Sequence, residues 1–127
     1  MMSPYKYFQS GTVVLIVEDE PLILMNAVCI IEDAGFTALV AGNADEAILI
    51  LEQRTDIRVV FTDIEMPGSM DGVKLARAIR GRWPPIDLIL TSGRRLVSPE
   101  DIPVRGRFLA KPYRPADVVE ALQQMAA

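Results

Sequence analysis

Five short apolar runs, separated by longer segments with helical character, limit the fold of this chain more than any other feature. Short runs rich in β-branched and aliphatic residues are typical of strands that are buried on both faces. Strands that alternate with helices form a parallel sheet covered on both sides. We therefore predict a doubly wound α/β fold with five parallel strands, whose runs are residues 12–17, 37–41, 58–62, 86–90 and 107–110.

Proline and polar capping residues mark where four of the five expected helices begin, namely the first, second, third and fifth. Pro21 and Pro115 suit the first turn of a helix, where a backbone N–H has no helical partner. Asn43 is followed three residues later by Glu46, as in a capping box, and Asp71 is a capping residue for the next helix. The predicted helices extend to about Gly35, Arg54, Arg82 and Met125.

The segment between the fourth and fifth runs, residues 92–106, differs from the other connections because it contains Pro99 and Pro103. A proline inside a helix removes a hydrogen bond and clashes with the preceding turn, at a cost of about 3 kcal/mol or more. We therefore predict a shortened or irregular fourth helix of at most one turn, which begins near Ser98 with Pro99 in its first position.

The same segment is locally basic, although the formal net charge of the chain is −4. Arg94, Arg95, Arg105 and Arg107 carry this charge. One interpretation is a solvated face, and the other is a docking patch for an acidic partner surface.

Composition narrows the classes of protein further. The 127 residues fit one domain, residues 12–127, preceded by an N-terminal extension, residues 1–11. The acidic balance argues against direct nucleic-acid binding. A single cysteine, Cys29, indicates a reducing compartment, and the apolar runs are too short to cross a membrane, so we expect a cytoplasmic protein. The absence of histidine excludes catalytic triads and most zinc sites.

Polar residues follow four of the five apolar runs. They are Glu18 and Asp19 after the first, Asp63 after the third, Thr91 after the fourth and Lys111 after the fifth. Ligands of open α/β sheets bind outside the carboxyl ends of the strands, so these side chains predict a site there. The run that lacks such a residue, the second, is expected at the margin of the sheet.

The chemistry of these residues predicts phosphoryl transfer. Three converging carboxylates would repel one another unless a cation intervenes, and Mg²⁺ prefers such oxygen ligands. Lys111 adds a positive charge and Thr91 a hydroxyl donor, which together neutralise a transferring phosphoryl group. Asp63 is then the carboxylate nucleophile that forms an aspartyl-phosphate.

Four motifs in this order resemble the receiver domain of two-component response regulators, typified by the single-domain chemotaxis regulator. The resemblance covers Thr12 to about Met125 and implies a flavodoxin-like (βα)5 fold. Its motifs are Val-Glu-Asp-Glu at residues 17–20, Asp-Ile-Glu-Met-Pro at 63–67 with Asp-Gly at 71–72, Leu-Thr-Ser-Gly at 90–93, and Phe108 followed by Lys-Pro at 111–112.

The resemblance implies that Asp63 accepts a phosphoryl group from a histidine kinase or a histidine phosphotransfer protein. It also implies that Asp19 and Asp63 ligate Mg²⁺ directly, with the backbone carbonyl of Glu65 as a third ligand. Glu18 replaces the aspartate most common at its position, and its expected contact with the metal runs through a bound water.

For the phosphorylated state, the resemblance implies a hydrogen bond from Thr91 and an ion pair from Lys111 to the phosphoryl oxygens. Phe108 matches the aromatic residue that turns inward in the switch, although it lacks the hydroxyl of the tyrosine often found there. We expect a mostly monomeric phosphorelay protein that signals to a downstream protein target and is no turnover enzyme.

Three alternatives remain open at this point. A degenerate receiver would act as a phosphorylation-independent docking module, but the intact acidic pair, acceptor, threonine and lysine argue against it. A nucleotide-binding domain would need a glycine-rich loop where this chain has residues 18–21, Glu-Asp-Glu-Pro. A metal-dependent phosphatase would place its aspartyl nucleophile after the first strand.

Overall fold

The computed structural model describes residues 12–66, 68, 70–93 and 98–126, and its elements alternate as predicted. The extension predicted for residues 1–11 lies outside the described residues, as do Arg94 and Arg95. The strands are β1 (Val13–Val17), β2 (Thr37–Ala41), β3 (Ile57–Asp63), β4 (Asp87–Ser92) and β5 (Gly106–Ala110). The α-helices are α2 (Pro21–Asp33), α3 (Ala44–Gln53), α4 (Gly72–Arg82) and α5 (Pro115–Ala126).

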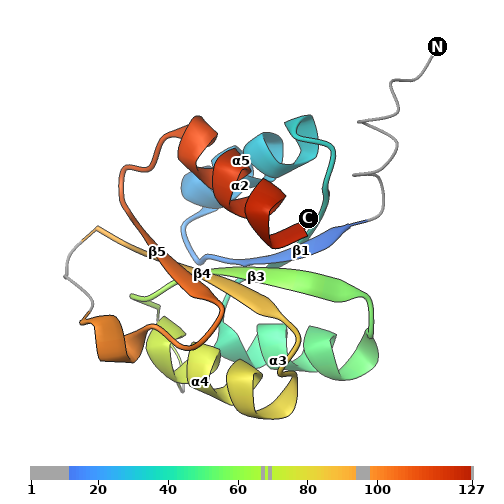
Figure 1. Cartoon of the computed structure of the whole chain (residues 1–127), viewed down its shortest axis with the longest axis vertical. Coiled ribbons are helices and arrows are strands. Elements are labelled where there is room, and N and C mark those ends of the chain that lie inside the picture. The colour runs from blue at the N-terminus through green and yellow to red at the C-terminus, as the bar shows by residue number, and fades with distance from the viewer. Residues whose placement is uncertain (1–11, 67, 69, 94–97, 127) are drawn as a thin grey trace.

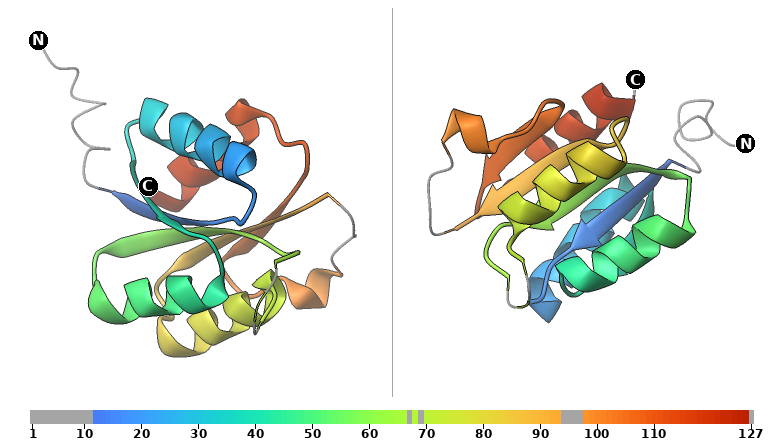
Figure 2. Two further views of the ribbon diagram at one scale, coloured as in Figure 1. Left: turned by 180° about the vertical axis from the view of Figure 1, so that it is seen from behind. Right: turned by 90° about the horizontal axis from the view of Figure 1, so that it is seen from below.

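All five strands are parallel and form one sheet in the order β2-β1-β3-β4-β5. Helices α3 and α4 cover one face of this sheet, and α2 and α5 cover the other (Figures 1 and 2). The order reverses between β1 and β3, so the carboxyl ends of the central strands form the crevice in which such sheets bind ligands. The predicted flavodoxin-like doubly wound fold is confirmed, with β2 at the margin.

The hydrophobic core lies in two layers because side chains of a strand point alternately to opposite faces. In β1, Val13, Leu15 and Val17 pack with residues of α3 and α4. Val14 and Ile16 pack instead with residues of α2 and α5. Both faces of the strand are therefore apolar, which explains why it reads as an unbroken apolar run.

The predicted caps are present. The side chain of Asn43 accepts a hydrogen bond from the backbone N–H of Glu46 at 2.9 Å, and Asp71 accepts one from the N–H of Lys74 at 2.9 Å. Each bond satisfies an N–H group at the start of a helix that has no helical acceptor. These caps fix the residues at which α3 and α4 begin.

The segment before β5 contains a short 3₁₀ helix, η1 (Pro99–Asp101), with Ser98 as its N-cap and Pro99 at its first position. The predicted single turn is thus confirmed for the described part of the segment. The fourth strand extends two residues beyond its predicted end at Leu90. It does so because the carbonyls of Thr91 and Ser92 accept hydrogen bonds from neighbouring chain segments.

None of the described helices combines the length and the apolar character that a membrane span requires.

Candidate functional site

The carboxyl ends of β1, β3 and β5 bring three predicted site residues into contact. The ammonium nitrogen Nζ of Lys111 lies 3.1 Å from Oε1 of Glu18 and 3.1 Å from Oδ2 of Asp63. Both carboxylates are buried, with 5% and 6% of their side chains exposed. The second oxygen of Glu18 accepts a hydrogen bond from the N–H of Glu20 at 3.0 Å. One lysine therefore bridges two buried carboxylates.

Burial dominates the electrostatics of this contact. Burial raises the pKa of Asp63, and the nearby charge of Glu65 adds to the increase, while Lys111 opposes it. Burial likewise raises the pKa of Glu18 against the hydrogen bonds from Glu20 and Lys111. Burial alone would lower the pKa of Lys111, but its hydrogen bonds to Glu18 and Asp63 outweigh that effect and the pKa rises. The lysine thus compensates the two carboxylates only in part.

A third carboxylate completes an acidic cluster. One oxygen each from Glu18, Asp19 and Asp63 lies within 4.8 Å of the other two. Within the described part of the chain, Oδ1 of Asp63 is buried and has no hydrogen-bond partner. Hard oxygen donors with uncompensated negative charge are what a divalent ion such as Mg²⁺ requires. The residues present therefore fit the predicted ion.

Thr91 lies beside the predicted acceptor, because β4 pairs with β3 so that Thr91 is opposite Asp63. Its hydroxyl oxygen is buried and finds no hydrogen-bond partner among the described residues. A small void next to it is also bordered by Glu18, Phe61 and Tyr113. Beside Asp63 there is thus a buried hydroxyl that no described residue pairs with.

Comparison with known proteins decides the family. The family model described as the response regulator receiver domain matches residues 14–123. This chain is a member of that family.

Curated relatives include the sensor kinase CckA of Brucella abortus (strain 2308), which is 31% identical over 116 residues, 88% of this chain. The putative response regulator NtrX-like of Rickettsia bellii (strain RML369-C) is 38% identical over 81 residues, 63% of this chain. The receiver spans only 12% and 17% of the lengths of these two proteins.

Solved structures of receivers share the fold. A response regulator receiver protein from Sinorhizobium medicae WSM419 is 26% identical, with a TM-score of 0.85, and the match covers 91% of this chain and 94% of that one. The receiver domain of the hybrid histidine kinase CckA is 27% identical, with a TM-score of 0.77 over 91% and 99% of the chains.

The Asp-Gly motif after β3 has a clear structural role in this receiver. A Cβ atom added at Gly72 would lie 2.2 Å from the backbone oxygen of Asp63 and 2.7 Å from the Cα of Ile64. The N–H of Gly72 donates to the carbonyl of Ile64 at 2.9 Å. Only glycine lets the start of α4 approach the end of β3 this closely, so Gly72 helps to hold Asp63 in place.

Two residues of the site were not predicted. Ser92 donates its hydroxyl to the carboxylate of Glu65, with oxygen distances of 2.7 and 2.8 Å. Tyr113 packs on Phe61 with ring centroids 5.4 Å apart, and burial raises its pKa, to which the charge of Glu18 adds. Ser92 stands inside a quoted motif, and Tyr113 follows the Lys-Pro motif, so their positions could have drawn attention to both.

Phe108 is partly buried and packs against the core layer of α3 and α4. Its role in switching stays a prediction. Glu65 lines the same pocket as Asp19, Asp63 and Lys111, and the role of its backbone carbonyl also stays a prediction.

Proposed function

We propose that this receiver accepts a phosphoryl group on Asp63 from a histidine kinase or a histidine phosphotransfer protein and signals through protein contacts. One observation carries the proposal. One carboxylate oxygen of Asp63 is held by Lys111 at 3.1 Å, while the other is buried without a hydrogen-bond partner among the described residues. An anionic oxygen with a free lone pair beside a fixed cation is suited to attack phosphorus.

In the proposed reaction, a carboxylate oxygen of Asp63 forms a bond to phosphorus as the bond from phosphorus to the donor's histidine nitrogen breaks. The electron pair of that bond returns to the imidazole. Lys111 then pairs with a phosphoryl oxygen, and the hydroxyl of Thr91 donates to another. Positioning and charge neutralisation supply most of the catalysis of such transfers.

Mg²⁺ belongs to this proposal as a cofactor. Asp19, Asp63 and the backbone carbonyl of Glu65 would ligate it, and Glu18 would act through a bound water. The ion would supply positive charge for the transferring group. The hard oxygen donors of the acidic cluster support this assignment.

We expect the phosphodonor protein to contact the surface beside the pocket that contains Asp63. Ile23 and Lys111 line both the pocket that holds the acidic cluster and an adjoining groove between α2 and the loop after β5. That groove is also lined by Leu22 and Tyr113, and Leu22 is 75% exposed. A donor whose histidine reaches Asp63 has to cover this rim, so we assign the groove to the phosphodonor.

We further propose that the chain is not a turnover enzyme, since its only reactions would be its own phosphorylation and dephosphorylation. The exposed, free thiol of Cys29 supports placing it in the cytoplasm, where thiols stay reduced. A receiver that serves only as a docking module is the alternative, and it would not need an acceptor, lysine and threonine arranged in this way.

Phosphorylation of the purified chain tests the proposal. With Mg²⁺ and a small phosphodonor, mass spectrometry should detect one added phosphoryl group that is lost in base. Asp63→Asn should take up none, because the amide is no nucleophile, whereas Asp33→Asn, an exposed change at the end of α2, should be labelled like the parent. Labelling of the Asp63→Asn variant would show that the acceptor lies elsewhere.

Binding of a phosphoryl mimic distinguishes the proposed phosphoacceptor from a phosphorylation-independent docking module. Beryllofluoride should bind only when Mg²⁺ is present, and ¹⁹F NMR reports the bound form. Failure to bind under any condition would favour the phosphorylation-independent docking module. Asp19→Ala should weaken Mg²⁺ binding, and binding should also weaken as the pH falls and the carboxylates take up protons.

A further inference from the structure

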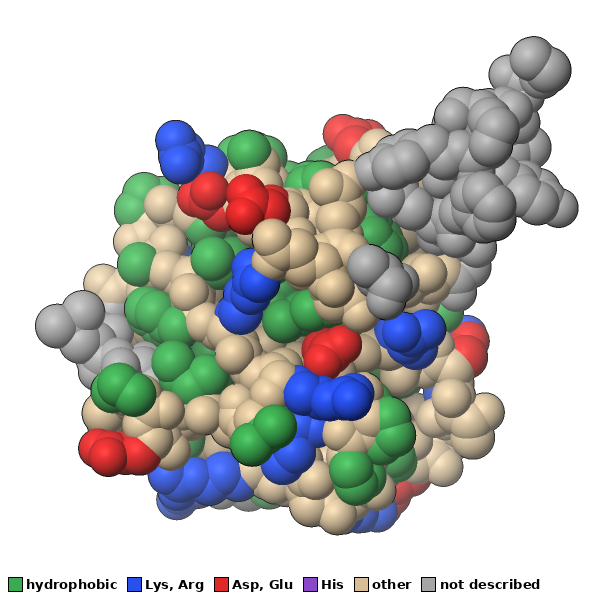
Figure 3. All heavy atoms as spheres, in the orientation of Figure 1, with side chains coloured by type: hydrophobic (Ala, Val, Ile, Leu, Met, Phe, Trp, Pro, Cys, Tyr) green, Lys and Arg blue, Asp and Glu red, His purple; other side chains and the backbone are tan. Residues whose placement is uncertain are grey.

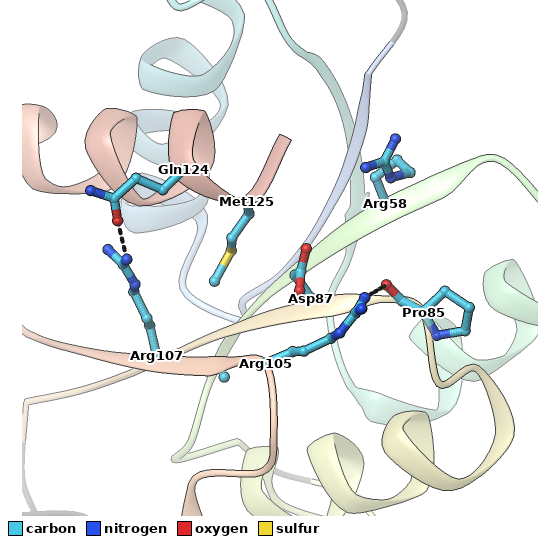
Figure 4. A pocket seen from close by; sticks show the side chains of 8 residues that line it. Arg58, Pro85, Asp87, Arg105, Arg107, Gln124 and Met125 are labelled. Carbon is cyan, nitrogen blue, oxygen red and sulfur yellow. Dashed lines mark hydrogen bonds between the residues drawn. The ribbon is translucent and has the colours of Figure 1, made fainter. Parts of the chain in front are cut away.

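A second pocket lies at the edge of the sheet opposite Asp63, between the amino ends of β3, β4 and β5 and the end of α5 (Figure 4). We call it the arginine pocket. Its chemically important lining residues are Arg58, Asp87, Arg105, Arg107, Gln124 and Met125.

The arginine pocket has more positive than negative charge. Three guanidinium groups surround the single carboxylate of Asp87, and in the described part of the chain none of them forms an ion pair with it. Figure 3 shows basic side chains gathered around an acidic one on the face that carries the end of α5. The carbonyl end of α5 adds only a partial negative charge. The arginine pocket is therefore basic, although the formal net charge of the chain is −4.

The guanidinium groups of the arginine pocket have more N–H donors than the described residues provide acceptors for. Arg107 donates to the neutral amide oxygen of Gln124, and Arg105 donates to the backbone carbonyl of Pro85 at 3.2 Å. The side chain of Arg58 is exposed, and it forms no hydrogen bond with the side chain or backbone of another described residue. Each guanidinium carries five N–H donors in a planar fork that matches a carboxylate. All three arginines are exposed, so the donors that no described residue uses are accessible to a ligand.

The backbone of Arg105 is a second and independent observation. Its φ is +65°, in the left-handed region that disfavours residues with a Cβ atom and suits glycine. Its carbonyl accepts from the N–H of Leu88 at 3.0 Å, and the N–H of Gly106 donates to Pro103 at 2.9 Å, so the turn is fixed. An arginine therefore occupies a position where glycine would be less strained, and it places a guanidinium at the pocket.

The arrangement of the charges identifies the ligand. The guanidinium group of Arg107 lies on one side of Asp87, and those of Arg58 and Arg105 lie on the other side (Figure 4). A single small anion placed between the two sides would meet the carboxylate of Asp87. An extended acidic peptide can contact both sides, because its carboxylates are spaced along the chain and its backbone N–H groups can donate to Asp87. Met125 adds an adaptable apolar wall.

We propose that the arginine pocket binds an acidic peptide segment of a partner protein. The carboxylates of the segment contact Arg107 on one side and Arg58 or Arg105 on the other, and its backbone faces Asp87. The pocket lies at the amino ends of the strands and Asp63 at the carboxyl end of β3, so both sites can be occupied at once. This proposal does not depend on phosphorylation of Asp63.

Binding of a blocked hexaglutamate peptide to the ¹⁵N-labelled full chain tests the proposal. The amide shifts should be confined to residues around Arg58, Arg105 to Arg107 and the end of α5. They should weaken several-fold when the ionic strength rises from about 0.05 M to about 0.5 M, because exposed charges are screened over shorter distances. Blocked hexaglutamine should produce no shifts.

Variants locate the site. Arg58→Gln or Arg107→Gln should each weaken binding roughly two- to fivefold, the size expected for one exposed charge contact, and the double variant should weaken it further. Arg77→Gln removes the same charge from α4, outside the pocket, where Arg77 pairs with Asp101, and should leave binding unchanged. Arg105→Gly should weaken binding yet raise the urea midpoint, since it relieves the positive φ.

Three results would overturn the proposal. Shifts spread evenly over the surface, or an equal loss of binding in Arg77→Gln, would reduce the effect to overall charge. Binding of inorganic pyrophosphate as tight as that of the peptide, at equal ionic strength, would make the pocket a small-anion site. Unchanged binding by Arg58→Gln, Arg105→Gly and Arg107→Gln, all folded, would place the peptide elsewhere.

Discussion

The replacement Asp63→Asn should make the protein more stable when no divalent ion is present, although it removes the proposed phosphate acceptor. The carboxylate of Asp63 lies within 4.8 Å of carboxylate oxygens of Glu18 and Asp19. Lys111 is its only close positive partner among the described residues, at 3.1 Å. Asparagine keeps the shape of the side chain and removes the charge, so the stability of the variant measures the balance of these forces.

Coulomb's law gives the size of that balance. At an effective dielectric constant of about 20, a separation of 4.8 Å corresponds to a repulsion of about 3.5 kcal/mol for each carboxylate. The attraction to Lys111 at 3.1 Å is about 5 kcal/mol on the same scale. Two repulsions exceed one attraction by about 2 kcal/mol. Solvent screens the exposed Asp19, so we expect a net gain of about 1–2 kcal/mol for the variant.

Urea denaturation followed by circular dichroism is the assay. With a slope of about 1–3 kcal/mol per molar urea, the midpoint should rise by roughly 0.5–1 M in buffer containing a chelator. Saturating Mg²⁺ should close the gap, because an ion at ten times its dissociation constant stabilises the parent by about 1.4 kcal/mol and the variant far less. Glu32→Gln, an exposed change on α2, should shift the midpoint little.

The pH dependence of the unfolding free energy independently tests whether Asp63→Asn stabilises the chain. Burial raises the pKa of Asp63 above its ordinary value of 3.8, so the folded chain holds this proton to a higher pH than the unfolded chain. The parent is therefore stabilised by protonation of Asp63 at low pH and loses that stability as the pH rises through the raised pKa. The advantage of Asp63→Asn should shrink as the pH falls from 7 toward 4. A variant less stable than the parent at neutral pH without Mg²⁺ would refute the reasoning, because the ion pair would then outweigh the repulsion.

Three further predictions concern the scaffold and are checked by the same denaturation measurement. Gly72→Ala should cost about 1–3 kcal/mol through overpacking against the end of β3, whereas Gly81→Ala, with no atom within 4 Å of the new Cβ, should stabilise α4 by about 0.5–1 kcal/mol; equal effects would contradict the close approach at Gly72. Asn43→Ala should cost about 1 kcal/mol through loss of the cap of α3, and a neutral result would mean that solvent replaces it. Leu122→Ala should cost about 2–5 kcal/mol because the side chain is fully buried, and a smaller loss would indicate that the α5 layer relaxes into the space.

Much of the site could be predicted from the sequence because its residues are tied to strand ends. A parallel sheet puts every carboxyl end at one edge, so Glu18, Asp63 and Lys111 had to lie near one another once the strands were recognised. The caps were equally accessible, since the bond from Glu46 to Asn43 spans only three residues. Local hydrogen bonding and strand direction were sufficient to predict these features from the sequence.

Other features depend on contacts between distant segments and were not predictable in this way. The fourth strand continues through Ser92 because the N–H of Lys111 donates to its carbonyl at 2.9 Å, a bond that only the assembled sheet provides. The hydrogen bond from Ser92 to Glu65 joins residues 27 positions apart. The arginine pocket likewise brings Arg58 together with Arg105 and Arg107 at the starts of three strands, although only Arg105 and Arg107 were singled out in the sequence.

The electrostatic cost at Asp63 and the proposed function have one origin. The cluster holds more negative charge than Lys111 compensates, so it favours the binding of a cation, and the proposed Mg²⁺ would supply that charge. In the proposed reaction, the phosphoryl group would give an acceptor to the buried hydroxyl of Thr91, which has no partner among the described residues. Satisfying such a group gains about 1–3 kcal/mol. A difference of that size between two conformations shifts their populations by about 5- to 150-fold, which is enough to couple Asp63 to a protein surface elsewhere on the domain.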